Sequence, residues 1–364
     1  MQLIGSIIAW CLLILLVAMT LLPFWRVGFW PVRLCDFFRL QVMVLSIALL
    51  VAFLIFAWQS GWSFQIGIGV LLLALVAGWQ LSNIVRYTPM WPREVPTAPE
   101  GVSEIRLTVV NLKVENQAKQ KVLQQLQELE VDLLLLIEID SAWAAALSPL
   151  KDDFPHRQGV VLDDGLGLML WSRLPLENAE VRYLVAESRP SIFAQVIAGE
   201  DRLNYVGLHP LPPGLPEDND TGRHDSRIRD AELMLVAKIV AEEPHASWVV
   251  SGDFNDVAWS HTTQMFQRIS GLKDPRVGRG FYNSYHAMYP WLRFPIDQVF
   301  ISSNGRIGEM SRFHPAGSDH FAIKAAVSFS HRPTSNNPTA SPSDMEQAEE
   351  MVEEGQEDAA DVNR

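Results

Sequence analysis

Three short polar segments in the last third of the chain carry residues suited to phosphate chemistry. They are Ser251-Gly252-Asp253-Phe254-Asn255, Ile296-Asp297-Gln298-Val299 and Ser318-Asp319-His320. Each segment adjoins a run of apolar, strand-like residues, so its polar side chains are expected at the rim of a β-sheet. Acids, an amide and a histidine together can hold a divalent metal, orient a water and polarise a phosphate. The segments therefore predict a metal-dependent phosphoesterase.

The spacing within these segments suggests pairs of cooperating side chains. Asp253 and Asn255 are one residue apart, so on an extended backbone both point to the same side while Phe254 points into the core. A turn favoured by Gly, Asp and Asn is the alternative. Asp297 can accept a hydrogen bond from one imidazole nitrogen of His320, which fixes the tautomer and raises the basicity of the other. The alternative is a solvated aspartate and a loop histidine that never meet.

Polar residues also end apolar strands earlier in the chain: Asn111 after 105–110, Glu138 after 133–137, and His209 after 203–208. A carboxylate at the end of a buried strand is costly unless it is paired or metal-bound, although such a glutamate can also lie in solvent. A single histidine after a strand is more often packed or exposed than catalytic. Structural or solvent-exposed roles are expected for the histidines that lack such flanks, which are His156, His224, His245, His261, His286 and His314.

The order of these polar residues resembles the endonuclease/exonuclease/phosphatase superfamily, which includes DNase I, AP endonucleases, sphingomyelinases and inositol phosphatases. The segment at 167–175, Gly-Leu-Met-Leu-Trp-Ser-Arg-Leu-Pro, is similar to the central Gly-to-Ser-Arg-x-Pro strand of that family. The resemblance covers residues 104–328. It implies an α/β fold, a four-layer α/β/β/α sandwich of the DNase I type.

The resemblance also implies a metal site. Glu138 is expected to bind Mg²⁺ or Mn²⁺, with Asn111 near it and Asp319 as a further ligand or a support for that ligand. Oxygen ligands of this kind suit these hard ions and not zinc.

Catalytic roles follow from the same resemblance. His320, oriented by Asp297, resembles the general base that activates water, or a contact to the phosphate. Asp253 and Asn255 would position the nucleophile and the scissile phosphate, while the metal would stabilise charge on the phosphoryl oxygens.

His209 looks like the general acid of the DNase I and sphingomyelinase branches, which favours phosphodiester substrates with a poor leaving group. In DNase I a glutamate of the central strand supports this histidine. This chain has Leu166, Gly167 and Leu168 there instead, so the acid role of His209 is the weaker part of the resemblance.

Three apolar stretches near the N-terminus, 3–22, 40–58 and 64–81, contain no charge and are close to the ~20 residues that a helix needs to cross a bilayer. Tryptophans near their ends fit interfacial anchors. A cleaved signal peptide is excluded for the first stretch because no Lys or Arg precedes it and two further spans follow. The first loop holds Arg26, Arg33 and Arg39, and Arg86 and Arg93 follow the third span. The arginine distribution predicts an inner-membrane protein with its N-terminus outside and its catalytic part in the cytoplasm.

The chain divides into a transmembrane region (1–87), a proline-rich linker (88–103), a catalytic domain (104–330) and an acidic tail (331–364) expected to be disordered because it lacks apolar periodicity. Strands are expected at 105–112, 131–139, 167–171, 192–197, 203–208, 248–250, 299–301 and 321–327. Helices are expected at 117–130 and 225–241.

Charge is unevenly distributed in a chain whose formal net charge is -13. Residues 1–100 carry five arginines against three acids, whereas the tail carries nine acids against two arginines, which leaves the middle acidic. An acidic domain argues mildly against non-specific nucleic-acid binding, which depends on Lys and Arg. Cys11 and Cys35 both lie in the membrane region, so the sequence indicates neither a disulfide framework nor a zinc site.

Three functions are compatible with these features. The leading prediction is a membrane-tethered, Mg²⁺-dependent phosphodiesterase, nuclease-like, acting on nucleic acid. The second is cleavage of a phospholipid headgroup in the manner of sphingomyelinases, which the membrane tether and the acidic domain favour. The third is an inactive binding module anchored to the membrane, which the complete set of site residues disfavours. No obligate protein partner is inferred.

Overall fold

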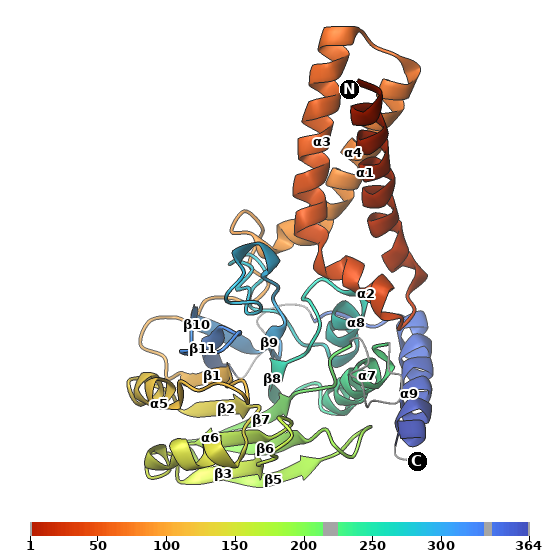
Figure 1. Ribbon diagram of the computed structural model, residues 1–364. Helices are drawn as coiled ribbons and strands as arrows, with labels where there is room; N and C mark the ends of the chain where they lie inside the picture. Colours follow the sequence, from red (N-terminus) through yellow and green to blue (C-terminus); the bar gives the residue numbers. More distant parts are fainter. Residues whose placement is uncertain (1, 214–224, 331–336, 363–364) are drawn as a thin grey trace.

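Two β-sheets form the centre of the folded region in a computed structural model that describes residues 2–213, 225–330 and 337–362 (Figure 1). The first sheet contains β1 (Ile105–Asn111), β2 (Leu133–Ile137), β3 (His156–Val160), β4 (Leu168–Ser172), β10 (Gly305–Phe313) and β11 (Ala322–Phe329). The second contains β5 (Leu176–Arg182), β6 (Ser191–Ala198), β7 (Asp201–Leu208), β8 (Ser247–Asp253) and β9 (Asp297–Ile301). Their strand orders are β10-β11-β1-β2-β4-β3 and β5-β6-β7-β8-β9.

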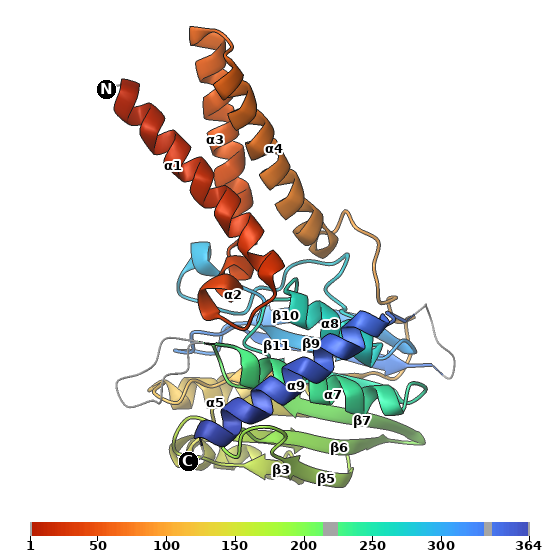
Figure 2. The ribbon, with the colours of Figure 1, turned by 90° about the vertical axis from the view of Figure 1, so that its right-hand side faces the viewer.

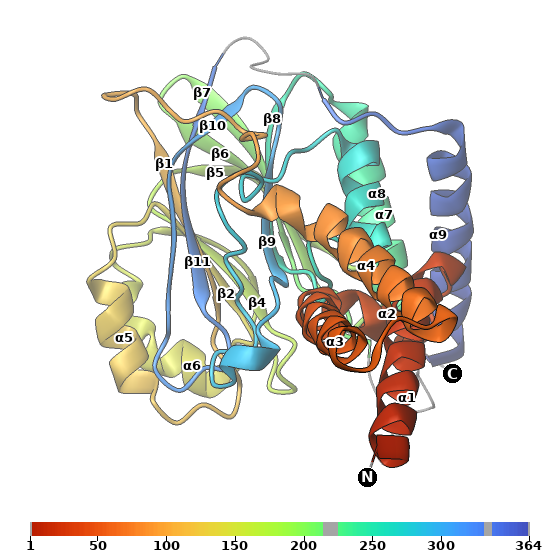
Figure 3. The ribbon, with the colours of Figure 1, turned by 90° about the horizontal axis from the view of Figure 1, so that it is seen from above.

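Helices cover the outer face of each sheet, so the domain has four layers (Figure 3). The helices are α5 (Lys119–Gln127) and α6 (Ser141–Ala146) on the first sheet, and α7 (Arg227–Glu242) and α8 (His261–Ser270) on the second. Side chains alternate along each strand, so Val109 packs between the sheets while Val110 packs with the helices. Each fully buried apolar side chain of this kind contributes roughly 1.5–3 kcal/mol. The predicted α/β/β/α sandwich is confirmed.

The strands that the sequence did not reveal all lie at sheet edges. β3 and β10 flank the first sheet, and β5 flanks the second. Their side chains are largely half-buried or exposed, so no apolar run marks them. Edge strands commonly carry polar residues in this way, which blunts their unpaired backbone groups.

Three helices among the described residues are long and apolar enough to cross a membrane, as predicted. They are α1 (Gln2–Leu21), α3 (Arg39–Ser60) and α4 (Phe64–Ile84), and the apolar spans run over Ile4–Trp25, Arg39–Ser60 and Phe64–Tyr87. Leu13, Phe53 and Leu73 pack between them, whereas most other apolar side chains face outward. The three helices rise from one side of the domain (Figures 1 and 2).

The first loop of the membrane region is a folded part of the domain surface. It contains the short helix η1 (Leu22–Trp25) and the helix α2 (Trp30–Phe37). The backbone N–H of Ser226 donates to the carbonyl of Gly28 at 2.8 Å, and Trp259 Nε1 donates to the carbonyl of Asp36 at 2.7 Å. Long-range hydrogen bonds therefore attach α2 and the residues just before it to the segments that precede α7 and α8. Further short helices are η2 (Val85–Tyr87), η3 (Ser148–Leu150) and η4 (Pro290–Leu292).

The expected disorder of the acidic tail is wrong for residues 342–362, which form the helix α9 (Pro342–Val362) lying along α7 (Figure 2). Small and apolar residues recur every three or four positions, and Ala348, Gly355 and Ala359 are buried. A Cβ at Gly355 would lie 2.3 Å from the Cβ of Ala231, so the two helices cross closely there. This spacing of small and apolar residues indicates an amphipathic helix, but the acidic composition of the tail led to the prediction of disorder. Residues 331–336, with His331, and His224 lie outside the described residues.

Basic residues of α7 and α8 meet the acids of α9. Arg268 makes two contacts with the Asp344 carboxylate, at 2.7 and 3.0 Å, and Arg227 Nε lies 2.9 Å from Asp358. Ser341 begins the helix: its backbone N–H donates to Asp344, whose own N–H donates to the Ser341 hydroxyl. This reciprocal pair is a capping box, which satisfies backbone donors that a helix start leaves free. The acids therefore hold α9 in place.

Candidate active site

Strand direction brings the predicted polar residues to a single edge of the sandwich. In the first sheet, β1 and β2 are parallel and β11 is antiparallel to β1, so the ends of β1 and β2 lie beside the start of β11. In the second sheet, β7 and β8 are parallel and β9 is antiparallel to β8. The residues at or next to these strand ends are Asn111, Glu138, His209, Asp253, Asn255, Asp297, Asp319 and His320.

A cavity of about 580 Å³ opens at this edge. Six of the predicted residues line it: Glu138, His209, Asp253, Asn255, Asp319 and His320. Asn111 and Asp297 lie behind the wall, and each contacts a residue that lines it. The structure thus gathers all eight positions, although they are up to 209 positions apart in the sequence.

Glu138 enters the cavity from a strained backbone position. Its φ of 61° is left-handed, which few residues other than glycine adopt and which often marks a functional position. One carboxylate oxygen accepts from Asn111 Nδ2 at 2.9 Å and the other from the backbone N–H of Val114 at 3.2 Å. Burial raises the pKa of Glu138, although these two hydrogen bonds oppose the rise. Asn111 therefore orients the Glu138 carboxylate, which is buried and accepts hydrogen bonds but has no cationic hydrogen-bond partner among the described residues.

His320 is held between two aspartates, as its spacing from Asp297 suggested. Its Nδ1 lies 2.8 Å from Asp297 Oδ2, and its Nε2 lies 3.7 Å from Asp253 Oδ2. Burial alone would lower the pKa of His320, but Asp297 and Asp253 raise it to about 9. Burial and then Asp297 raise the pKa of Asp253 to about 7, against the opposing effect of His320. Two aspartates beside one imidazole favour its protonated form, and a protonated imidazole suits a contact to phosphate better than the role of a base.

Asp253 and Asn255 reach the cavity through a turn, and the extended backbone expected between them is absent. β8 ends at Asp253, and the backbone N–H of Asn255 donates to the Asp253 carboxylate at 2.9 Å. Asn255 has a left-handed φ of 50°, and its amide donates to the carbonyl of Pro210 at 3.0 Å. At the level of sequence, a turn and two side chains on the same side were alternatives. In the structure the backbone turns at Asn255, and the side chains of Asp253 and Asn255 nevertheless line the same cavity. Phe254 is buried in the core beneath.

Asp319 has a cationic partner within the protein. Lys113 Nζ lies 3.1 Å from its carboxylate, and this hydrogen bond raises the pKa of the lysine. Asp319 lines the cavity but is not among the acids whose ligand atoms lie within 4.8 Å of one another in the described residues. Lys113 also lines the cavity and was missed; it stands two positions after Asn111, which was the available signal.

His209 and Arg189 bring unpaired polar atoms to the cavity. His209 Nδ1, Arg189 Nε and Arg189 Nη1 are buried without a hydrogen-bond partner among the described residues. Burial, followed by the charges of Arg189 and His320, lowers the pKa of His209 well below its usual value. A Cβ at Gly167 would lie 1.9 Å from the carbonyl oxygen of Ile139, so no glutamate fits there to support His209. Nothing local in the sequence marked Arg189.

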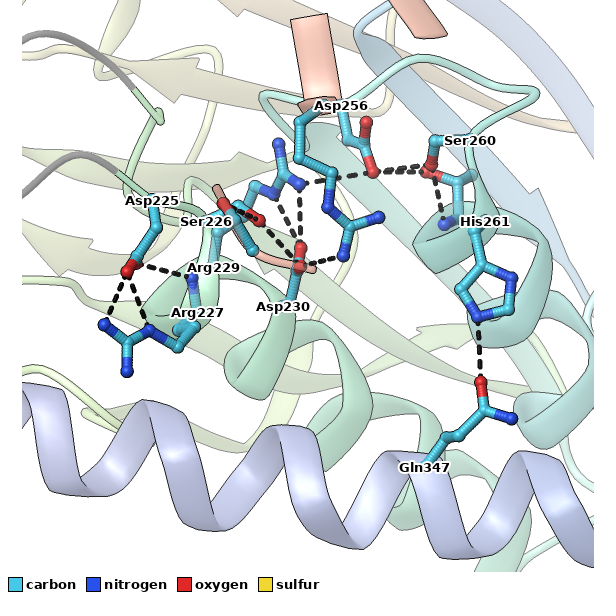
Figure 4. Close-up of polar contacts among 12 residues, drawn as sticks. Asp225, Ser226, Arg227, Arg229, Asp230, Asp256, Ser260, His261 and Gln347 are labelled. Carbon is cyan, nitrogen blue, oxygen red and sulfur yellow. Dashed lines mark hydrogen bonds and ion pairs between the residues drawn. The ribbon is translucent and has the colours of Figure 1, made fainter. Parts of the chain in front are cut away.

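A second buried cluster, the arginine network, lies between α2 and the cavity, and Figure 4 shows its members Arg229, Asp230 and Asp256. Arg33 of α2 lies 2.7 Å from Asp230 of α7, and Arg229 lies 2.7 Å from Asp230 and 3.5 Å from Asp256. Arg229 Nη1 also donates to the carbonyl of Asn255 at 2.7 Å. We define the network as Arg33, Arg229, Asp230 and Asp256. It links a loop between two membrane helices to the backbone of a cavity residue.

Within the arginine network, opposite charges offset burial. Burial alone would raise the pKa of Asp230, but Arg229 and Arg33 lower it. Burial alone would lower the pKa of Arg229, but Asp230 and Asp256 raise it. Burial outweighs Arg229 at Asp256, whose pKa is raised. Arg33 entered the sequence analysis as a marker of topology, whereas the structure uses it as a buried structural residue.

The donor set fits a divalent cation. Asp253, Asp297 and His320 offer ligand atoms within 4.8 Å of one another, and the Glu138 carboxylate lines the same cavity. We call these four residues the catalytic cluster. Its three acids share one imidazole, and the raised pKa values of Glu138 and Asp253 are those expected of carboxylates without enough counter-charge. Oxygen-rich surroundings of this kind suit Mg²⁺ or Mn²⁺.

Comparison with known proteins agrees with this geometry. A sequence model of the Endonuclease/Exonuclease/phosphatase family matches residues 110–320. The humanised TDP2 of D. rerio superposes with a TM-score of 0.52 at 17% identity, over 62% of this chain and 100% of the other. D. rerio TDP2 in complex with a single-strand DNA product gives 0.51 at 17% identity, over the same shares. Sphingomyelinase C from Streptomyces griseocarneus gives 0.46 at 14% identity, over 62% and 99%. No curated protein matches the sequence.

Proposed function

The chain belongs to the endonuclease/exonuclease/phosphatase family, and from this premise we propose that it is a membrane-anchored, metal-dependent phosphodiesterase. The observation that supports it best is the catalytic cluster, in which Glu138 and the Asp297–His320–Asp253 chain share one cavity. A binding module would have no use for a buried excess of carboxylates, which destabilises the fold unless a cation joins it.

The protein groups bind and orient the reacting atoms. Asp297 holds the ring of His320 in one orientation, so its Nε2–H faces the cavity and donates to a phosphoryl oxygen. Asp253, with its pKa of about 7, is matched to take the proton of the attacking water at neutral pH. Asn255 and His209 contribute contacts to the phosphate from the second sheet. In this assignment the base is Asp253, and His320 takes the phosphate-contact role.

Glu138, oriented by Asn111, would hold Mg²⁺ or Mn²⁺, which leaves Asp253 to act as the base and Asp297 to orient His320. A bound ion of this type supplies Lewis-acid stabilisation of charge on the phosphoryl oxygens. Asp319 and its partner Lys113 stand at the side of this position and set its local charge.

The membrane topology is also a proposal. Three spans place the first loop and the domain on one side, in accord with the contacts of α2 to the domain. We infer that this side is the cytoplasm and that the N-terminus lies outside, because the loop and the segment after α4 carry the arginines. A reporter that works only in the cytoplasm should be active when it is fused after Phe329. If instead a reporter that works only in the periplasm is active at this position, the orientation is the reverse.

The central experiment compares the full-length protein with His320→Ala in detergent, using the soluble diester bis(p-nitrophenyl) phosphate and Mg²⁺ or Mn²⁺. Wild type should turn over in a metal-dependent way, and the variant should lose about 100-fold or more in kcat, the range for removing one hydrogen-bond donor to the developing negative charge. Unchanged melting would show that the fold is intact. His245→Ala, outside the site, is the control. Metal-independent turnover, or a fully active His320→Ala protein, would reject the proposal.

A further inference from the structure

The membrane region forms part of the wall of the active-site cavity. Trp30, Arg33, Leu34 and Phe37, all on α2, line the same cavity as the catalytic cluster. α2 joins the first membrane-spanning helix to the second within 13 residues, between Trp25 and Arg39, so it lies at the surface of any bilayer that the helices cross. The reacting position is therefore bounded by a membrane-surface helix on one side.

A second apolar element stands on the other side of the cavity. Tyr285, whose ring lies 4.9 Å from that of His320, begins a loop that contains η4. Trp291 is 86% exposed, and Met288 and Leu292 are exposed beside it. Gln41, near the start of α3, donates to the carbonyl of Trp291 at 2.8 Å, which places the loop at the base of a spanning helix. Exposed tryptophan at this depth is typical of the membrane interface.

Apolar side chains are thus exposed on both sides of the cavity where it meets the spanning helices. On the α2 side Leu34 is exposed and Trp30 and Phe37 are half-buried, and all three line the cavity; on the loop side Met288, Trp291 and Leu292 are exposed. We call these six residues the apolar rim. Large exposed side chains gathered at one place mark a contact surface in soluble proteins. Here the rim is continuous with helices that are apolar over their whole length, so its natural partner is the bilayer.

The interior of the cavity, in contrast, is built for an anion. Arg189 and His209 both line it, and Arg189 Nε, Arg189 Nη1 and His209 Nδ1 are buried without a hydrogen-bond partner among the described residues. Arg189 is 6% exposed, so a buried positive charge lies at the cavity wall. A planar guanidinium binds phosphate oxygens in pairs. The cavity therefore combines a phosphate-binding interior with an apolar mouth.

We propose that the substrate is an amphiphilic phosphodiester held by the bilayer, whose phosphate enters between α2 and the η4 loop while its apolar chain stays at the rim. This inference rests on the proposed function and names its substrate class. Nucleic acid fits less well, because the rim offers tryptophan and leucine where a polyanion needs Lys and Arg, and the catalytic domain has a net negative charge.

The reaction is a hydrolysis that needs no further reactant. The oxygen of water attacks phosphorus and loses a proton to Asp253, one phosphoester P–O bond breaks, and the departing alkoxide takes up a proton from solvent while Asp253 returns its proton to solvent. The products are a phosphomonoester and an alcohol, of which the one that carries the apolar chain remains in the membrane.

The test uses two esters that share their scissile bond, p-nitrophenyl methyl phosphate and p-nitrophenyl hexadecyl phosphate, with full-length protein in detergent micelles and Mg²⁺ or Mn²⁺. The hexadecyl ester should have a kcat/KM at least tenfold above the methyl ester. The double variant Trp291→Ser, Leu292→Ser should bring this ratio close to one and leave methyl-ester turnover within twofold of wild type. Val102→Ser, an exposed apolar position at the opposite end of β1, is the matched control and should keep the preference.

Each alternative result has a distinct meaning. Turnover of the methyl ester without any hexadecyl preference would overturn the lipid inference and leave the phosphodiesterase proposal standing. Degradation of single-stranded DNA at a higher kcat/KM than the hexadecyl ester would also overturn it in favour of nucleic acid. A rim variant that loses both esters equally would refute the assigned role of the rim. No turnover of either ester or of DNA would reject the proposed function itself.

Discussion

The catalytic cluster and the arginine network are neighbouring groups of buried charged residues, and they differ in how many cationic partners the acids have. In the network, two arginines face two aspartates, and the pKa of Asp230 is lowered as a result. In the catalytic cluster, three acids share one imidazole, and the pKa values of Glu138 and Asp253 are raised. A cluster with equal numbers of acids and arginines stabilises the fold by itself. A cluster with more acids than cationic partners has room for the charge of the proposed cation. Burial raises the pKa of Asp256 in the network as well, so the two groups differ in the number of cationic partners for each acid, and the sign of the pKa shift does not separate them.

Replacing Glu138 should have the largest effect on this contrast. Glu138→Gln removes the carboxylate that would hold the metal, so metal-dependent turnover should fall by about 100-fold or more, because a Lewis-acid ion contributes several kcal/mol. Removing an acid with a raised pKa should leave the protein in EDTA as stable as wild type. Added Mg²⁺ or Mn²⁺ raises the melting temperature of wild type, since a ligand that binds only the folded state stabilises it, and this rise should disappear.

The measurement is thermal unfolding of the full-length protein in detergent, with EDTA and with a series of metal concentrations. Glu115→Gln is the matched control, because Glu115 also lines the cavity but is exposed. A full metal response in Glu138→Gln would place the cation elsewhere and remove the distinction between the two clusters.

Breaking the arginine network should instead destabilise the fold. Arg229→Met leaves Asp230 and Asp256 buried without their shared partner, and the loss of one member of a buried ion pair costs roughly 3–5 kcal/mol. Turnover should also fall, since Arg229 holds the backbone of Asn255. The measured quantity is the melting temperature in EDTA, because metal binding does not contribute to stability under this condition.

Arg202→Met is the control for this substitution. Arg202 pairs with Glu177 at 2.9 Å, but both side chains are at least half exposed, so the change should cost below about 1 kcal/mol. Equal melting temperatures for the Arg229 and Arg202 variants would show that the buried network contributes no more than a surface pair.

The smallest effect concerns pH and the docking of α9. His261 of α8 lies 3.1 Å from Gln347 of α9, and burial, followed by the charge of Arg26, lowers its pKa from 6.5 to about 4. Between these values the unfolded chain binds a proton that the folded chain does not. Stability therefore falls as pH drops from about 6.5 towards 4, by on the order of 1 kcal/mol at pH 5.

Hydrogen exchange of the α9 amides at pH 7 and pH 5, corrected for intrinsic rates, measures this loss. In His261→Gln the hydrogen bond can persist but the titration cannot, so protection should change less between the two pH values. A pH dependence as steep as that of wild type would assign the effect to other groups of α9, such as Glu354, whose pKa is raised by burial.

The sequence by itself determined the catalytic edge and the spans. The strands that lead to Glu138 and Asp253 end at the same edge of the sandwich. Parallel neighbours end at the same edge, and antiparallel neighbours begin there. The local sequence pattern that marks each strand is therefore enough to predict this edge. Length and apolar composition likewise determine the membrane helices. Only the tertiary structure decided that Arg33 pairs with Asp230, that Arg189 lines the cavity and that α2 and the η4 loop flank it. Arg33 and Asp230 are 197 positions apart, and Gln41 and Trp291 are 250 apart, so no periodicity records these contacts. Their partners become neighbours only when burial of the core has brought the chain together.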